Sequence, residues 1–110
     1  MATVYLGLGT NLGDKEANLR TAIYKLQERI GKQVSLSSFY ETAPWGFESD
    51  HSFLNAAIGL ETSLSPIEIL HITQEIEKEL GRTKKSVNGS YSDRLIDIDI
   101  LLYDTLVLQI

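Results

Sequence analysis

Alternating apolar and polar positions are the clearest pattern in this chain, and they predict β-strands. In the strongest example, residues 52–62, four apolar residues fall on one face: Leu54, Ala56, Ile58 and Leu60. The rest of the chain predicts strands over residues 3–9, 34–40 and 94–103, and a short strand over 105–109.

Two other stretches repeat their apolar residues at helical spacing and predict α-helices. The first covers residues 14–30 and ends before Gly31, because glycine is favoured just after a helix. The second begins at a capping box formed by Ser65 and Glu68, with proline between them, and it closes at Gly81. The buried stripes are predicted to be Leu19, Ala22, Ile23, Leu26 and Ile30 in the first helix, and Ile69, Ile72, Thr73, Ile76 and Leu80 in the second.

The order of these elements is strand, helix, strand, strand, helix, strand, which is the βαββαβ order of the ferredoxin-like α+β fold. In that fold two helices cover one face of an antiparallel sheet and leave the other face open. The alternation places an aromatic ring, an amide and two acids on the open face. The residues predicted to line it are Tyr5, Gly7, Phe53, Asn55, Asp97 and Asp99. Their gathering on an uncovered face predicts a ligand-binding site.

Asp97 and Asp99 alternate with Ile96, Ile98 and Ile100 in one strand, so both carboxylates point to the same side. Their Cα atoms lie roughly 7 Å apart at about 3.3 Å of rise per residue. At an effective dielectric near 20, two unit charges at that separation repel by about 2 kcal/mol. A divalent cation between them would remove this repulsion. A sheet with one solvated face explains the same alternation without any cation.

Composition narrows the classes of protein. The 110 residues are 43% hydrophobic and 23% charged, as in a soluble globular protein, and we expect residues 1–110 to form a single domain. No apolar run approaches about 18 residues, which predicts no membrane span. The chain has no cysteine and no signal-like start, so a cytoplasmic location is the default expectation. The net charge of −5 argues against a nucleic-acid partner, while the oligomeric state stays open.

Residues 82–94 form a basic segment in an acidic chain, because four of the ten basic side chains lie there: Arg82, Lys84, Lys85 and Arg94. The serine, asparagine and glycine residues among them predict a long polar loop directly before the aspartate strand. Such a loop is either a solvated connection or a lid that closes over an anionic ligand.

Five stretches of the chain, taken together, resemble the 6-hydroxymethyl-7,8-dihydropterin pyrophosphokinases of folate biosynthesis. In the order of that family they are residues 7–13, 38–44, 53–57, 77–82 and 94–101. Each stretch is weak alone, but the ordered set covers nearly the whole chain and is specific. The resemblance implies an ATP-dependent pyrophosphokinase. Such an enzyme moves a pyrophosphoryl group from ATP to the hydroxymethyl group of the pterin and releases AMP.

The resemblance also implies roles for individual residues. Asp97 and Asp99 match the acids that hold two Mg²⁺ ions, and Arg82 and Arg94 match catalytic basic positions. The positions that match pterin-binding residues are Thr42, Pro44, Trp45, Gly46, Phe53 and Asn55. The positions that match residues near ATP are Gln74, Glu77, Arg82, Lys84, Tyr91 and Ile100. The chemistry agrees, since Mg²⁺ takes carboxylate and phosphate oxygens and two such ions clamp a phosphoryl group in transfer.

Two features depart from the family pattern. Tyr91, Ser92 and Asp93 stand where the family usually has Trp-Gly-Pro, so stacking by this loop would fall to Tyr91. Family members usually continue past Ile110, and the resemblance therefore implies a C-terminally short domain whose adenine site is incomplete. Activity of the 110 residues alone is accordingly a separate question.

Three other classes of protein share parts of these patterns. A dinucleotide-binding protein would explain Gly7 and Gly9 after a strand, but the spacing to Gly13 and the two consecutive middle strands differ from the Rossmann pattern. A nucleotidyl-transfer palm would explain the paired acids but needs a surface for a polynucleotide. The main alternative is a non-catalytic ferredoxin-like module that binds a small molecule, and it requires no paired role for Asp97 and Asp99.

Overall fold

The computed structural model describes residues 1–11, 13–42, 52–81, 96–104 and 106–107. The strands are β1 (Ala2–Thr10), β2 (Lys32–Leu36), β3 (Tyr40–Thr42), β4 (Phe53–Thr62), β5 (Asp97–Tyr103) and β6 (Leu106–Val107). The helices are α1 (Lys15–Arg29) and α2 (Pro66–Gly81). Neither described helix has the length and apolar character that a membrane-crossing helix needs.

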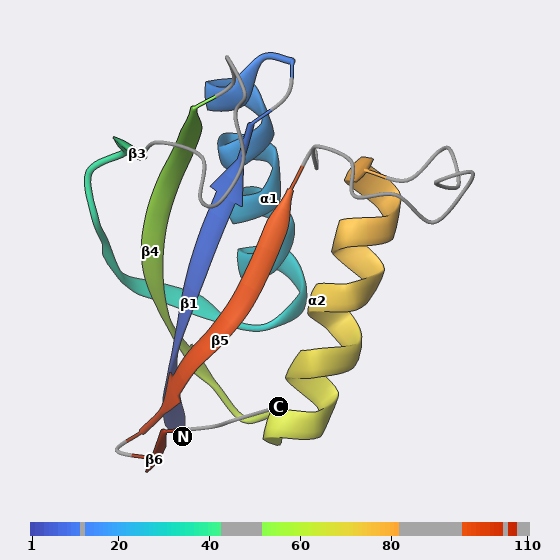
Figure 1. Cartoon of the computed structure of the whole chain (residues 1–110). Helices are drawn as coiled ribbons and strands as arrows, with labels where there is room; N and C mark the ends of the chain where they lie inside the picture. Colours follow the sequence, from blue (N-terminus) through green and yellow to red (C-terminus); the bar gives the residue numbers. More distant parts are fainter. Residues whose placement is uncertain (12, 43–51, 82–95, 105, 108–110) are drawn as a thin grey trace.

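The described strands form one antiparallel sheet in the order β2-β4-β1-β5-β6, and β3 also pairs with β4. β1 lies at the centre, where Val4 pairs with Leu60 of β4 on one side and with Tyr103 of β5 on the other. Figure 1 shows both helices on one face of this sheet. Within the described residues no helix covers the opposite face. The predicted ferredoxin-like α+β arrangement is confirmed.

The hydrophobic core lies between the sheet and the two helices. The stripes predicted for both helices are buried or partly buried there, against Val4, Leu6 and Leu8 of β1. Burying one such side chain contributes about 1.5–3 kcal/mol. A slip of one residue in a strand would turn its whole apolar set outward, so burial fixes which side chains of β1, β4 and β5 reach the open face.

The predicted strand over residues 34–40 is wrong in its middle, because the structure divides it into β2 and β3. Ser37 explains the break. Its backbone N–H donates to the carbonyl oxygen of Ala57 at 2.9 Å, while its Oγ accepts the N–H of Ala57, also at 2.9 Å. The side chain thus takes the place of the backbone acceptor, which ends the regular ladder before the chain returns as β3.

The predicted capping box of α2 is confirmed. The backbone N–H of Ser65 donates to Glu68 Oε1 at 2.9 Å, and the backbone N–H of Glu68 donates to Ser65 Oγ at 3.3 Å. The hydrogen bond from the Ser65 backbone, followed by that with its side chain, holds the pKa of Glu68 below its ordinary value. The sequence signal therefore located the start of this helix correctly.

α1 ends where the sequence predicts, but glycine is required at position 31 for a different reason from the predicted one. The only glycine with a positive φ among the described residues is Gly13, at 66°, so Gly31 is not a left-handed cap. A Cβ on Gly31 would overlap the carbonyl oxygen of Glu61 in β4. Glycine is needed there because two backbone segments approach each other closely.

The pairing of β5 with β1 shifts by one residue, because Leu101 is an extra residue opposite the step from Leu6 to Tyr5. Leu101 lines the open face on the same side as Asp97 and Asp99, and the shift changes the orientation of the residues after it. Tyr103 turns back toward the core, where its hydroxyl donates to the carbonyl oxygen of Leu64 at 2.7 Å. The alternation predicted along this strand therefore ends at the bulge.

Candidate ligand site on the open face of the sheet

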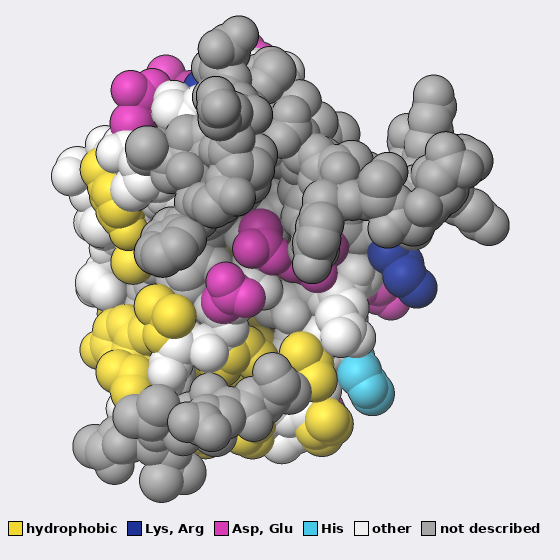
Figure 2. Space-filling view, in the orientation of Figure 1, with side chains coloured by type: hydrophobic (Ala, Val, Ile, Leu, Met, Phe, Trp, Pro, Cys, Tyr) yellow, Lys and Arg dark blue, Asp and Glu magenta, His cyan; other side chains and the backbone are white. Residues whose placement is uncertain are grey.

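A pocket lies on the open face, where β1 ends and β4 and β5 begin. Figure 2 shows acidic side chains near the middle of this face and hydrophobic side chains over its lower half. All the residues predicted to line the open face, apart from Tyr5, contribute to the pocket. The described residues that line it are Gly7, Leu8, Gly9, Tyr40, Phe53, Asn55, Ala56, Ala57, Asp97, Asp99 and Leu101.

Strand register arranges the pocket residues in rows across the sheet. One row runs from Asn55 of β4 through Gly9 of β1 to Asp97 of β5. The next row contains Ala57, Gly7 and Asp99. Neighbouring strands lie about 4.8 Å apart, so Asn55 and Asp97 are roughly 10 Å apart across the floor. The two glycines leave this floor without side chains, which allows a flat ligand to approach the backbone closely.

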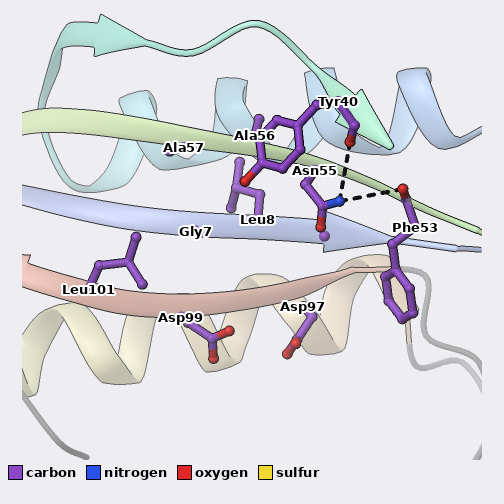
Figure 3. A pocket seen from close by; sticks show the side chains of 11 residues that line it. Gly7, Leu8, Tyr40, Phe53, Asn55, Ala56, Ala57, Asp97, Asp99 and Leu101 are labelled. Atoms are coloured by element: carbon purple, nitrogen blue, oxygen red, sulfur yellow. Dashed lines mark hydrogen bonds between the residues drawn. The ribbon is translucent and has the colours of Figure 1, made fainter. Parts of the chain in front are cut away.

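Asn55 has its amide nitrogen committed to its own chain (Figure 3). The Nδ2 atom lies 3.0 Å from Thr42 Oγ1, 3.2 Å from the carbonyl oxygen of Tyr40 and 3.4 Å from that of Phe53. Its Oδ1 atom is turned toward Gly9 and would lie 3.1 Å from a Cβ on that residue. Asn55 therefore presents a hydrogen-bond acceptor to the pocket, and Thr42 contributes by fixing that orientation.

Asp97 is half-buried and Asp99 is exposed, and Figure 3 shows both carboxylates on the same side of β5. The described part of the chain contains no group of three or more His, Asp or Glu side chains suited to a metal ion. Two carboxylates nevertheless suffice for Mg²⁺, which completes its coordination with phosphate oxygens and water. The donor set therefore fits a Mg²⁺ ion that arrives with a polyphosphate ligand.

Three residues predicted near ATP lie outside the described pocket. Gln74 is exposed on α2, and Glu77 on the same helix accepts the backbone N–H of Ile98 at 2.8 Å. Ile100 is partly buried against the hydrophobic core. Their contacts with the nucleotide stay predictions.

The remaining predicted site residues lie outside the described residues, and so does the predicted basic loop over 82–94. They are Pro44, Trp45 and Gly46 for the pterin, and Arg82, Lys84, Tyr91 and Arg94 for ATP and catalysis. Their roles also stay predictions.

Sequence reasoning did not assign Tyr40, Gly9 or Leu101 to the site. Tyr40 reaches it because β3 pairs opposite Asn55. The alternation of apolar and polar residues does not predict that pairing. Leu101, in contrast, lies two residues after Asp99 and shares its face by alternation. Gly9 did leave a signal, since a glycine inside a strand often marks a place where a ligand or another backbone comes close.

The fold and the pocket together define a class of protein, namely a ferredoxin-like domain with a pocket beside a pair of acids on its open face. Residues 5–110 match the family described as 7,8-dihydro-6-hydroxymethylpterin-pyrophosphokinase (HPPK). The chain belongs to this family.

Individual relatives agree with this assignment. The 2-amino-4-hydroxy-6-hydroxymethyldihydropteridine pyrophosphokinase of Porphyromonas gingivalis is 61% identical over 103 residues, which are 94% of this chain and 70% of the relative. The Bacillus subtilis protein of the same name is 45% identical over 101 residues, 91% of this chain and 59% of the relative. The solved structure of wild-type Plasmodium falciparum HPPK-DHPS has a TM-score of 0.72 at 17% identity. The match covers 94% of this chain and 29% of that one, and it shows the shared fold.

The family resemblance noted in the sequence is therefore confirmed. The family and its relatives support ATP-dependent pyrophosphoryl transfer to hydroxymethyldihydropterin, a step of folate biosynthesis, with ATP as co-substrate. The non-catalytic binding module is not favoured. The chain spans about 59 to 70% of the length of the two bacterial relatives.

Proposed function

We propose that the open face of this chain holds the pterin over Gly9 beside Asn55 and holds the phosphates of ATP beside Asp97 and Asp99. The observation that carries the proposal is the row in which Asn55, Gly9 and Asp97 share one floor. The two ends of the row differ in chemistry, with a neutral acceptor at one end and carboxylates at the other. This difference suits a ligand pair whose ring is neutral and whose reacting partner is a polyphosphate.

The pterin end is supported by the orientation of Asn55. The names of the relatives include a 2-amino group, which is a hydrogen-bond donor and would find its acceptor in Asn55 Oδ1. The half-buried Phe53 lines the same end and offers an aromatic face to a planar ring. We propose that Thr42 acts by fixing Asn55 and that residues 44–46 add further contacts to the ring.

The paired carboxylates support the proposed placement of the ATP phosphates at the other end of the row. We propose that these carboxylates hold two Mg²⁺ ions. When bound, Mg²⁺ neutralises the phosphate charge and stabilises the charge that develops during transfer. The hydroxymethyl oxygen attacks the β-phosphorus of ATP, the bond from that phosphorus to the α-phosphate oxygen breaks, AMP leaves and the hydroxyl proton is released. Such transfers depend mainly on positioning and electrostatics, which the strand positions of Asp97 and Asp99 supply.

The basic residues of the predicted loop complete the proposal. Arg82, Lys84 and Arg94 would neutralise the phosphates, Tyr91 would stack on a substrate, and closure of the loop would exclude water. The two small molecules are the proposed partners. The cytoplasmic location and the absence of a nucleic-acid partner stay predictions.

An assay of AMP release from ATP tests the proposal, with 6-hydroxymethyl-7,8-dihydropterin and Mg²⁺ present and the Porphyromonas gingivalis relative run in parallel. We expect AMP formation that requires both the pterin and Mg²⁺. Asp97→Ala and Asp99→Ala should each abolish it while leaving the thermal unfolding temperature nearly unchanged. Turnover retained in either variant would exclude the proposed metal site, and no AMP from the unsubstituted chain would exclude its activity.

A further inference from the structure

The contact between Glu77 and Ile98 joins α2 to the strand that carries the two aspartates. Glu77 Oε2 accepts the backbone N–H of Ile98 at 2.8 Å in a partly buried setting. Ile98 lies between Asp97 and Asp99 in the sequence. The carboxylate of α2 therefore reaches the backbone at the midpoint of the acidic pair.

Strand register shows which edge of β5 this contact occupies. β5 pairs with β1 along one edge, but the N–H of Ile98 is taken by Glu77 and so points away from β1. Backbone groups alternate in direction along a strand, so those of Asp97 and Asp99 point toward β1. Among the described residues, β6 pairs with the outer edge of β5 at Leu102 and Tyr103, beyond the acidic pair. Glu77 thus binds the outer edge where no described strand does.

The segment that carries Asp97 and Asp99 is consequently held from two sides, by β1 on one edge and by Glu77 on the other. A carboxylate acceptor makes a stronger hydrogen bond to an N–H than a neutral acceptor does. A displacement of the backbone at Ile98 would move both acidic side chains together, because one lies on each side of it. Their common position relative to a shared ligand therefore depends on this bond.

We infer that Glu77 is a positioning residue for the pair Asp97 and Asp99 and acts through the backbone of Ile98. The inference rests on the proposed role of the two aspartates in binding Mg²⁺. It differs from the direct contact with ATP that the sequence resemblance implies for Glu77. The two roles can be separated, because glutamine keeps an acceptor oxygen and removes the negative charge.

The test uses the whole chain with Glu77→Ala, Glu77→Gln and a control, Glu75→Ala. Glu75 lies on the same helix and is exposed, with its Oε1 atom 3.6 Å from Arg29 Nη1. Amide hydrogen exchange at Ile98, measured by NMR on ¹⁵N-labelled protein, reports the contact itself. Electron paramagnetic resonance measures Mn²⁺ binding in the presence of a non-hydrolysable ATP analogue, and it requires no turnover.

We expect Glu77→Ala to speed exchange at Ile98 about tenfold or more and to weaken Mn²⁺ binding about tenfold. Glu77→Gln should keep most of the protection from exchange at Ile98 and most of the affinity for Mn²⁺. Glu75→Ala should change neither quantity. Unchanged exchange in Glu77→Ala would overturn the contact. Faster exchange with unchanged Mn²⁺ binding would reduce Glu77 to a structural role.

A further result would assign Glu77 to direct contact with the nucleotide. In that case Glu77→Gln would protect Ile98 normally yet bind Mn²⁺ as weakly as Glu77→Ala, which overturns the positioning role. Failure of the unsubstituted chain to bind Mn²⁺ with the analogue would overturn the proposed function and this inference together. That outcome is distinct from the others, in which only the Glu77 variants differ from the unsubstituted chain.

Discussion

Asn55 donates its side-chain amide to the hydroxyl oxygen of Thr42 at 3.0 Å, across the pairing of β4 with β3. This bond orients the Asn55 side chain so that Oδ1 faces Gly9. The short β3 thus has a defined role in the pocket, although its side chains are exposed.

Thr42→Val tests this role, because valine keeps the shape of threonine and removes the acceptor. The loss of one hydrogen bond of about 1 kcal/mol should raise the KM for the pterin about fivefold, with little change in kcat. Steady-state kinetics measures both constants. Thr21→Val, on the exposed side of α1, is the matched control and should leave KM unchanged. An unchanged KM in Thr42→Val would show that the remaining acceptors hold Asn55 by themselves.

The floor of the pocket can be tested with a matched pair of glycine substitutions. A Cβ on Gly9 would lie 3.1 Å from Asn55 Oδ1, whereas a Cβ on Gly7 would meet Leu101 at ordinary contact distances of 3.5 Å or more. Gly9→Ala should therefore weaken pterin binding tenfold or more, and Gly7→Ala should weaken it less. Isothermal titration calorimetry measures the affinities. Alanine is favoured over glycine in a strand by roughly 0.5–1 kcal/mol, so neither substitution should lower stability by its backbone effect. If both substitutions weakened pterin binding equally, the proposed position of the pterin over Gly9 beside Asn55 would be contradicted.

The sequence predicted the side of the sheet for Asn55, Asp97 and Asp99 because their apolar neighbours pack in the core, and Phe53 shares the face of Asn55 by alternation. A buried apolar neighbour on each side leaves only one orientation for the residue between them. Residues whose placement depends on a local irregularity were not predictable in this way. Tyr40 follows a break caused by a serine side chain, and Tyr103 turns to the core after a bulge; both are decided by hydrogen bonds between distant segments.

The capping box of α2 predicts a measurable loss of stability. Ser65→Ala removes the hydroxyl that accepts the N–H of Glu68, and it should lower the free energy of unfolding by about 1 kcal/mol. For a domain of this size the unfolding temperature should fall by roughly 4–8 °C. Differential scanning calorimetry provides the measurement, and Ser63→Ala at an exposed position outside the helix is the control. Equal unfolding temperatures for the two variants would show that the box contributes nothing.

The ion pairs between α1 and α2 predict a pH dependence. Hydrogen bonds from Arg29, at 2.7 Å, and then from Lys25, at 3.1 Å, lower the pKa of Glu79 to about 2 from its ordinary 4.5. Because the pKa is lower in the folded state, these pairs stabilise the fold above pH 4.5, and the stabilisation is lost as the pH falls toward 2.

Glu79→Gln should therefore flatten the decline of the unfolding temperature between pH 4.5 and 2, and high salt should reduce the difference between the two proteins. Thermal scans at several pH values test this expectation. Glu75→Gln is the control, because Glu75 lies 3.6 Å from Arg29 and its side chain is 65% exposed. If the unfolding temperature of Glu79→Gln declined with falling pH as steeply as that of the unsubstituted chain, Glu79 would not be the source of this pH dependence.

The sheet keeps its packing on one side and its pocket on the other. Residues such as Gly7, Gly9, Ala57 and Leu101 contribute little to the contacts with the helices. A combinatorial library randomised at these positions should consequently yield mostly folded variants, which could be screened directly for altered ring preference. The positions that determine ligand selectivity and the positions that maintain the folded state would then be separate sets in this small domain.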